Sequence, residues 1–378
     1  KMQNSIRDVV VVGGGIVGFS IAYRLANEGM TVTVIERDSV GNNASGYALG
    51  LLNPTNETGV TEGLNHHSFK MHKEFLEVVQ EESGVDVQIL KLPHIELALE
   101  QSEVIKLKSE VSRINEFDEF NANWLETEEV LRLEPRVSSD IFGGILVEHV
   151  IMVDSYNLTL ATAQAAEHRG VEVVLGEVTG INYHKGTVAG VTLKHAEIAC
   201  DSVVLALGPW SGAASSWIDI NIPIVPQKGE IVRVEGLEPQ LNLHLHGNAF
   251  GSSCSVVQKK DNAIWLAATV EDGTGFDVNP SIEAMEVLSR RGVRMVPALE
   301  SHQMVLHTAC MRPVSSDGEP ILGKVPGKDR VFLATGTGGK GVLMGPVIGK
   351  AISDLVIQGQ TDLPISNLGL ERFGRSIS

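Results

Sequence analysis

A glycine-rich turn near the start of the chain and an arginine near its end are the residues best suited to chemistry. Residues 13–18 read GGGIVG and match the pattern G-x-G-x-x-G. In this pattern the first glycine permits a tight turn, the second lets the backbone approach a pyrophosphate, and the third lets a helix pack closely on a strand. Arg312, in the segment HTACMRPVSSDGEPILG, carries a planar guanidinium that can bind a carboxylate through two hydrogen bonds. We therefore expect a nucleotide at the first feature. At the second we expect either an anionic ligand or a structural ion pair with an acidic neighbour.

The residues around the glycine turn predict the strand–turn–helix–strand unit that binds nucleotides. Residues 8–12 form a nearly continuous apolar, β-branched run, which is typical of a buried parallel strand. Apolar residues then recur at helical spacing up to Gly29, where a helix-ending glycine is expected. A second strand, residues 31–35, leads to Glu36, whose carboxylate can accept hydrogen bonds from a ribose. Because NAD and FAD both place a pyrophosphate at the N-terminus of such a helix, this unit alone leaves both cofactors open.

The composition is that of a globular enzyme or binding protein. The length of 378 residues suggests two domains, and 43% hydrophobic with 20% charged residues is enough to build a core. Lys and Arg number 30 against 47 Asp and Glu, and the net charge of −17 opposes non-specific binding to nucleic acid or anionic membranes. Three widely spaced cysteines (Cys200, Cys254 and Cys310) fit a reducing cytoplasm better than a disulfide framework. The apolar run 9–22 contains four glycines and reads as strand, turn and helix, so we expect a cytoplasmic protein without a membrane span.

The rest of the chain alternates between α/β segments and antiparallel strands. Strand, helix and glycine-turn patterns return at residues 153–176, 201–212 and 330–359, whereas alternating residues between 222 and 270 predict half-buried antiparallel strands. We therefore predict an α/β fold with a discontinuous Rossmann-like nucleotide-binding domain and a second α+β domain on a mainly antiparallel sheet. The expected boundaries are 1–84, 142–216 and 304–378 for the first domain, and 85–141 and 217–303 for the second. A glycine turn at the C-terminal end is not expected of a linear NAD dehydrogenase, so this organisation favours FAD.

Five motifs resemble the D-amino-acid-oxidase superfamily of flavoenzymes, in particular the branch of glycine oxidase, sarcosine oxidase and D-amino-acid dehydrogenase. In chain order they are VVVVGGGIVG, IER, ALGPWSG, RPVSSDGEPILG and TGTGGKGVLMGP, and the resemblance extends over nearly the whole chain. It implies a bound FAD, covalent or non-covalent. It also implies oxidation of a C–N bond next to a carboxylate, with hydride transfer from the α-carbon to flavin N5 and hydrolysis of the resulting imine.

The resemblance also assigns residues to a cofactor site and a substrate site. Glu36 matches the ribose acid, and Val178 falls where the family holds the adenine through backbone atoms. Arg312 matches the arginine that pairs with the substrate carboxylate. Lys340, beside the last glycine turn, either adds positive charge that stabilises the reduced flavin or is a solvated surface lysine, and with Arg312 it completes the expected catalytic residues. The expected cofactor-binding residues are Gly13, Gly15, Ile16, Val17, Gly18, Glu36, Arg37, Ala44, Ser45, Gly50, Leu51, Val178, Ala206, Gly208, Trp210, Gly338, Gly339, Lys340, Gly341 and Val342.

Two departures from the glycine-oxidase pattern leave the substrate open. Ser255 stands at about the position of a family tyrosine, and Thr337 and Gly339 replace a histidine and an arginine of the last glycine turn. The pocket therefore lacks an aromatic wall and a cationic contact, and glycine is not assumed to be the substrate. The expected substrate-binding residues are Arg312, Ser255, His244 and His246; the two histidines are included because they belong to the predicted second domain.

Several alternatives remain at this point. The histidine pairs 66–67 and 244/246 have no cysteine or carboxylate at ligand spacing beside them, so no metal is expected. Cys310 stands where sarcosine oxidases bond a cysteine to the flavin, although a buried free cysteine is the commoner interpretation. The alternative functions are a flavin-dependent 2-hydroxy-acid dehydrogenase, which needs a base such as a histidine, and a flavoprotein subunit of a larger complex. The expected partners are a small amino-acid-like substrate with a carboxylate, oxygen or an electron carrier, and a second copy of the chain.

Overall fold

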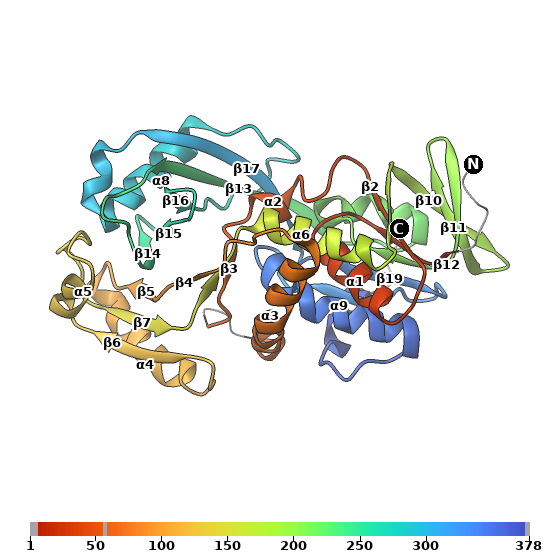
Figure 1. Cartoon of the computed structure of the whole chain (residues 1–378), viewed down its shortest axis with the longest axis horizontal. Coiled ribbons are helices and arrows are strands. Elements are labelled where there is room, and N and C mark those ends of the chain that lie inside the picture. The colour runs from red at the N-terminus through yellow and green to blue at the C-terminus, as the bar shows by residue number, and fades with distance from the viewer. Residues whose placement is uncertain (1–6, 56–58, 375–378) are drawn as a thin grey trace.

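The computed structural model describes residues 7–55 and 59–374, which fold into two lobes (Figure 1). Each lobe is built on an eight-stranded sheet, and a small three-stranded sheet lies between them. The small sheet consists of β3 (Leu51–Leu52), β8 (Ile151–Met152) and β4 (Leu90–Lys91). The chain passes between the lobes several times, as the sequence predicts, so neither lobe is a continuous segment.

The first sheet has a parallel centre flanked by antiparallel strands. Its order is β10-β11-β12-β1-β2-β9, with β19 on β12 and β18 on β19. The strands β9, β2, β1, β12 and β19 are parallel to their neighbours along this series. The bounds are β1 Arg7–Val12, β2 Val32–Glu36, β9 Glu172–Leu175, β10 Val178–His184, β11 Thr187–Leu193, β12 Ala196–Leu205, β18 Ile321–Lys324 and β19 Val331–Thr335.

Two hydrophobic cores explain why β1 is apolar throughout. Val9 and Val11 face the core formed with the helices, whereas Val10 and Val12 face a second core on the opposite side of the sheet. Since successive side chains of a strand point to opposite faces, a strand that is covered on both faces needs a continuous apolar run. The helices of this lobe are α1 (Ile16–Asn27), α2 (Ala44–Tyr47), α3 (Glu62–Ser83), α6 (Ser155–His168), α7 (Ser215–Ile218) and α9 (Gly341–Gln358), with 3-10 turns at Gly208–Ala214, Ser366–Leu368 and Leu370–Phe373.

The second sheet is antiparallel except at one pair of strands. Its order is β17-β13-β16-β15-β14-β5-β7-β6, and only β14 and β5 run parallel within it. Helix α8 (Ile282–Met295) contributes Leu288 and Met295 to its core. The strands are β5 His94–Leu97, β6 Asn121–Leu125, β7 Gly144–Glu148, β13 Ile224–Glu235, β14 His244–Ala249, β15 Ser252–Gln258, β16 Ala263–Ala267 and β17 Met304–Ser315; the other helices of this region are α4 (Val104–Ile114) and α5 (Thr127–Leu133), with 3-10 turns at Gln101–Glu103 and Pro297–Ser301.

The strand pairing departs from the expected domain boundaries at two places. The predicted first-domain segments 142–216 and 304–378 begin with β7 and β17, and both strands belong to the second sheet. β7 pairs with β5 and β6, and β17 pairs with β13 along almost its whole length. The residue pattern of a single strand shows that it is half buried but not which sheet it joins, so the sequence could not place these two strands.

Helix α9 is long and apolar enough to cross a membrane by length and composition, and 61% of it is buried inside the fold. It shares the first core with α1 and α3 through residues such as Met344 and Ile348. Its apolar character is therefore that of a core helix.

Candidate active site

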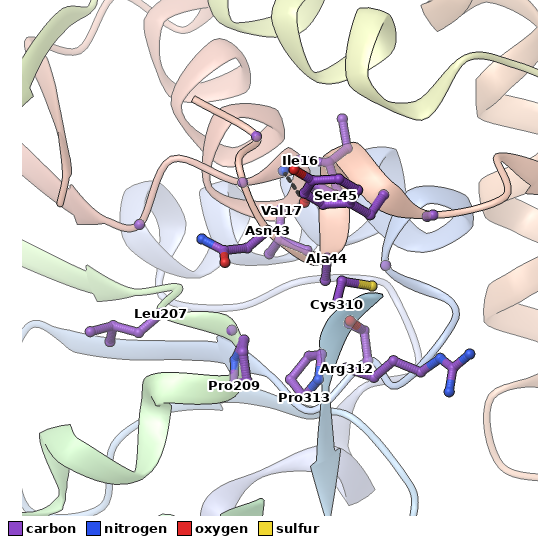
Figure 2. Close-up of a pocket in the computed structure, with 18 of the residues that line it drawn as sticks. Ile16, Val17, Asn43, Ala44, Ser45, Leu207, Pro209, Cys310, Arg312 and Pro313 are labelled. Atoms are coloured by element: carbon purple, nitrogen blue, oxygen red, sulfur yellow. Dashed lines mark hydrogen bonds between the residues drawn. The ribbon is translucent and has the colours of Figure 1, made fainter. Parts of the chain in front are cut away.

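A cavity of about 560 Å³ lies between the two lobes. Its lining comes from the glycine turn after β1, the segment 41–49, the end of β12, the turn before α9 and one face of the second sheet. Figure 2 shows this arrangement, with the residues from Asn43 to Ser45 opposite Cys310, Arg312 and Pro313 of β17. The cavity brings together segments that are far apart in the sequence.

The glycine turn fits tightly against β12. A Cβ at Gly13, which has a φ of +116°, would lie 2.2 Å from the carbonyl oxygen of Ala206. A Cβ at Gly18 would lie 2.0 Å from the carbonyl oxygen of Gly13, so the helix α1 can begin here only without that side chain. Gly18 supports the turn from behind and does not line the cavity. The glycines therefore bring the backbone to the cavity surface, as the motif predicts.

Two helices begin at the cavity. Helix α1 follows Gly15, which offers no side-chain cap, and the N–H of Ile16 donates to Ser45 Oγ at 3.0 Å (Figure 2). Helix α9 follows Lys340, again without a side-chain cap, and its residue Gly341 lines the cavity. A helix N-terminus carries a partial positive charge and unpaired N–H groups, so each of these ends is suited to negative charge on a ligand.

Polar and aromatic side chains of the first lobe line the cavity next to the end of β2. Glu36 Oε2 accepts from the N–H of Gly14 at 2.7 Å, and Oε1 accepts from the N–H of Asp38 at 2.8 Å, so the carboxylate is held at the cavity edge. The Arg37 guanidinium lies 4.7 Å from the ring centroid of Trp210, whose other contact is a stacked Phe276 at 5.3 Å. Each carboxylate oxygen of Glu36 retains a lone pair for a further donor, such as a ribose hydroxyl.

This lining fits FAD. The carboxylate of Glu36, the bare backbone of the glycine turn and the N-termini of the two helices all border one cavity. They offer an acceptor for a ribose and donors for a pyrophosphate, which are the groups of a dinucleotide. Val178, at the start of β10, also lines the cavity, two residues after Gly176, whose N–H donates to the carbonyl oxygen of Glu36 at 2.8 Å.

Arg312 has no acidic partner among the residues that the structure describes. Its Nη1 donates to the carbonyl oxygen of Thr269 at 2.9 Å, and the guanidinium lies across Gly229, where a Cβ would come within 2.4 Å of Nη2. Burial lowers the pKa of Arg312, against the opposing effects of Cys310 and Glu271. A partly buried cation without an ion-pair partner is costly, so this guanidinium is suited to an anionic ligand. The expected alternative, a structural ion pair, is not found in the described part of the chain.

Thr269 is itself fixed by three hydrogen bonds. Its hydroxyl accepts from the N–H of Glu230 at 2.9 Å and donates to Glu271 Oε1 at 2.5 Å. Its own N–H donates to the carbonyl oxygen of Glu230 at 3.1 Å. Glu230 is fully buried and bonded to Lys228 at 2.9 Å, so the residue that orients Arg312 belongs to a rigid polar network.

Cys310 lies two residues before Arg312 on the same face of β17 and lines the cavity. Burial raises the pKa of its thiol, although the charge of Arg312 acts in the opposite direction. A covalent bond between Cys310 and the cofactor therefore stays a prediction. The raised pKa favours the neutral thiol, which is less reactive than the thiolate.

The second-lobe residues expected to bind substrate divide into two groups. Ser255 and His246 line the cavity. His244 does not: it is buried, and its Nδ1 lies 2.9 Å from Nδ1 of His94. His244 and His246 point to the same face of β14, but His244 is buried and His246 reaches the cavity. Their positions in the strand alone could not distinguish them.

Most of the expected cofactor residues line the cavity, and four do not. Those that line it are Gly13, Gly15, Ile16, Val17, Glu36, Arg37, Ala44, Ser45, Val178, Ala206, Gly208, Trp210, Gly338, Gly339, Gly341 and Val342. Those outside it are Gly18, Gly50, Leu51 and Lys340. Gly50 instead meets the backbone of Val153, where a Cβ would lie 2.1 Å from the carbonyl oxygen, and Leu51 pairs with β8. Lys340 forms the N-cap of α9.

Other lining residues were not expected from the sequence. Asn43 and Tyr47 belong to the segment 41–54, GNNASGYALGLLNP, which is rich in small residues, so their polar and aromatic side chains were available as a signal. Gly229, which lines the cavity, and Thr269, which lies behind Arg312 and is not part of the lining, gave no such signal. Only the pairing of β13 with β17 and the turn after β16 bring them to Arg312.

Comparisons with known proteins show which family and which solved structures the chain is similar to. The sequence model of a family described as FAD dependent oxidoreductase matches residues 8–355. A glycine oxidase of Bacillus subtilis (strain 168) is 28% identical over 360 residues, covering 94% of each chain. The crystal structure of the glycine oxidase of Geobacillus kaustophilus has a TM-score of 0.90 at 26% identity and covers 98% of this chain and 99% of that one. An L-proline dehydrogenase of P. horikoshii shares the fold, with a TM-score of 0.88 at 24% identity over 98% of both chains.

Proposed function

The chain belongs to the family of FAD-dependent oxidoreductases, and we propose that it oxidises the C–N bond of an amino acid or N-alkylated amino acid whose carboxylate binds Arg312. The observation that carries the proposal is the half-buried guanidinium of Arg312, which lines the cavity and has no acidic partner in the described residues. The relatives named glycine oxidase support an amine as the oxidised group.

The residues of the chain position the substrate. Arg312 would hold the carboxylate in a planar, two-point contact, and the carbonyl oxygen of Thr269 would keep the guanidinium in place. FAD, when bound, supplies the group that accepts a hydride from the α-carbon. The apolar side chain of Ile231, which is buried and lines the cavity, would limit water near Arg312. An amine that binds in its neutral form needs no general base, and water hydrolyses the imine product to a 2-oxo acid.

Replacement of Arg312 tests this function. We expect Arg312→Ala to lower kcat/KM for a carboxylate substrate by roughly 100- to 5,000-fold, because breaking a desolvated ion pair costs about 3–5 kcal/mol. Arg312→Lys should restore part of it, since lysine supplies the charge without the planar fork. The measurement is anaerobic reduction of the bound flavin by a panel of amino acids, N-methyl amino acids and 2-hydroxy acids, with FAD content as the control.

Two results would contradict the proposal. Near-normal kinetics of Arg312→Ala would mean that the carboxylate binds elsewhere. Reduction of the flavin by 2-hydroxy acids alone would favour the alternative dehydrogenase.

Three further proposals rest on the sequence. We propose that oxygen or an electron carrier is the final electron acceptor, that the protein is cytoplasmic and that it self-associates.

A further inference from the structure

One row of paired residues crosses the face of the second sheet that lines the cavity. Ile231, Ala267, Ser255 and His246 stand opposite one another on β13, β16, β15 and β14. Directly paired residues point to the same face of a sheet, and all four line the cavity. Ala267 and Ser255 have small side chains, so the space above the sheet between Ile231 and His246 stays open.

The row separates Arg312 from His246 by a substantial distance. The guanidinium lies across Gly229, two residues from Ile231 on β13. From β13 to β14 there are three strand spacings of roughly 4.8 Å, or about 14 Å in the plane of the sheet. A carboxylate on Arg312 therefore leaves space for a substituent that extends from the α-carbon toward His246.

His246 ends this row as half of a histidine–carboxylate pair. Its Nδ1 donates to Glu96 Oε2 at 2.6 Å, from the residue that pairs with it on β5. Its only hydrogen bond within the described ranges is through Nδ1, so Nε2 makes none there, and 22% of the side chain is exposed. The Glu96 side chain is only 16% exposed, so Glu96 orients the imidazole and leaves Nε2 for a ligand.

The surrounding groups favour a protonated His246. Burial opposes the charge, but the hydrogen bond and negative charge of Glu96 raise the pKa of His246. Burial lowers the pKa of both His94 and His244, which lie behind the pair, so these two rings stay neutral at pH 7. A protonated imidazole held at Nδ1 by a carboxylate presents Nε2–H as a hydrogen-bond donor.

We propose that His246, oriented by Glu96, is a second substrate-binding point for an acceptor oxygen, of a carboxylate or an amide, at the end of the substrate's side chain or nitrogen substituent. The inference rests on the proposed function, because Arg312 anchors the other end of the molecule. It assigns to this enzyme an amino acid with a polar, extended substituent, in place of glycine. Ser255 belongs to this subsite because its small side chain leaves the path open.

Binding of compounds that cannot be oxidised tests the subsite without turnover. Glutarate and its half-amide glutaramate carry an acceptor oxygen at the far end, whereas pentanoate ends in a methyl group. We expect the holoenzyme to bind the first two roughly 10- to 100-fold more tightly than pentanoate, as one hydrogen bond to a charged donor allows. The dissociation constants are measured from the perturbed absorption of the bound flavin and from thermal shift. The ratio of glutarate to glutaramate distinguishes a carboxylate from an amide.

Two variants and a control make the test specific. His246→Leu and Glu96→Gln should bring the three dissociation constants within about threefold of one another, with an unchanged constant for pentanoate. Asn248→Ala is the control, because Asn248 is exposed on the same strand and face and lies outside the cavity. Equal binding of all three compounds by the wild type, or an equal loss of all three in His246→Leu, would overturn the subsite.

Kinetics with matched amino acids separates this inference from the proposed function. Both enantiomers of glutamate, glutamine and norleucine are compared, and we expect kcat/KM to favour the acceptor-ended pair in the wild type but not in His246→Leu. If norleucine reduces the flavin as fast as glutamate and glutamine, the subsite is refuted while the proposed function stands. If no amino acid reduces the flavin but glutarate still binds through His246, the proposed function fails and the subsite stands.

Discussion

At the scale of single residues, the guanidinium of Arg312 depends on a residue that has no side chain. Gly229 lies beneath it on β13, and a Cβ there would lie 2.4–2.7 Å from three atoms of the guanidinium. The arginine therefore reaches Thr269 only because position 229 is glycine. The anion-binding geometry is shared between two adjacent strands.

Gly229→Ala should therefore displace Arg312 without removing its charge. We expect kcat/KM for a carboxylate substrate to fall by about 100-fold, the effect typical of a misplacement near 1 Å, while FAD content stays normal. The measurement is reduction of the bound flavin at varied substrate concentration. Gly180→Ala is the matched control, because Gly180 also lies in a strand and a Cβ there meets no atom within 4 Å. Equal kinetics of the two variants would show that the position of Arg312 in this structure is not the productive one.

At the scale of elements, helix α3 holds the first turn of α9 next to the cavity. His72 Nε2 lies 3.0 Å and 2.9 Å from the carbonyl oxygens of Val342 and Leu343 and donates to them, and Ser68 Oγ donates to Leu343 at 2.6 Å. Val342 also lines the cavity. The position of the second helix N-terminus is thus fixed by polar contacts from α3.

The contact between His72 and the first turn of α9 should make the stability of the fold depend on pH. Burial lowers the pKa of His72 to about 4, from 6.5 in the unfolded chain, so the folded state resists the proton that the unfolded state takes up. The stability is complete above pH 6.5 and is lost as the pH falls toward 4, with about 2 kcal/mol lost by pH 5. His72→Gln should reduce this loss.

The measurement is the difference in unfolding free energy or Tm of the holoenzyme between pH 7 and pH 5. Burial also lowers the pKa of His66, so His66 contributes to the total loss of stability between pH 7 and pH 5. The test is therefore the difference between the wild type and His72→Gln in that loss, and not the total loss. His67→Gln is the control, since His67 is exposed on the same helix. A pH dependence of His72→Gln equal to that of His67→Gln would remove His72 from this role.

At the scale of the whole molecule, the sequence predicted what depends on neighbours in the chain. The turn at residues 13–18 and its flanking strands are found as expected, because glycine spacing and apolar runs are local signals. The pair of His246 and Glu96 was not predicted, since its members are 150 positions apart and meet through the parallel register of β14 and β5. For the same reason the sequence did not assign β7 and β17 to the second sheet, because the residue pattern of a strand does not identify the strands it pairs with.

The lobes are joined by a buried lysine, which was also not predicted from the sequence. Lys259 lies where β15 turns back toward β16, and its Nζ donates to the carbonyl oxygens of Leu49 and Val153, each at 2.9 Å. Nζ also lies 4.1 Å from the ring centroid of Trp265. Burial lowers the pKa of Lys259 to about 8. Leu49 lines the cavity, so this side chain connects the second sheet to the loop that would contact the cofactor.

Lys259→Met should therefore weaken cofactor binding from outside the cavity. Methionine keeps the apolar stem but leaves two carbonyl groups without their donor, and each hydrogen bond from a charged group contributes about 1.5–3 kcal/mol. We expect a lower Tm and a dissociation constant for FAD raised by at least tenfold, measured by fluorescence of the released flavin. Lys260→Met is the control, because Lys260 is the exposed neighbour in the same turn. If both variants retain FAD equally, the loop 44–49 is held by its contacts with the first lobe, and Lys259 stabilises only the turn that carries it.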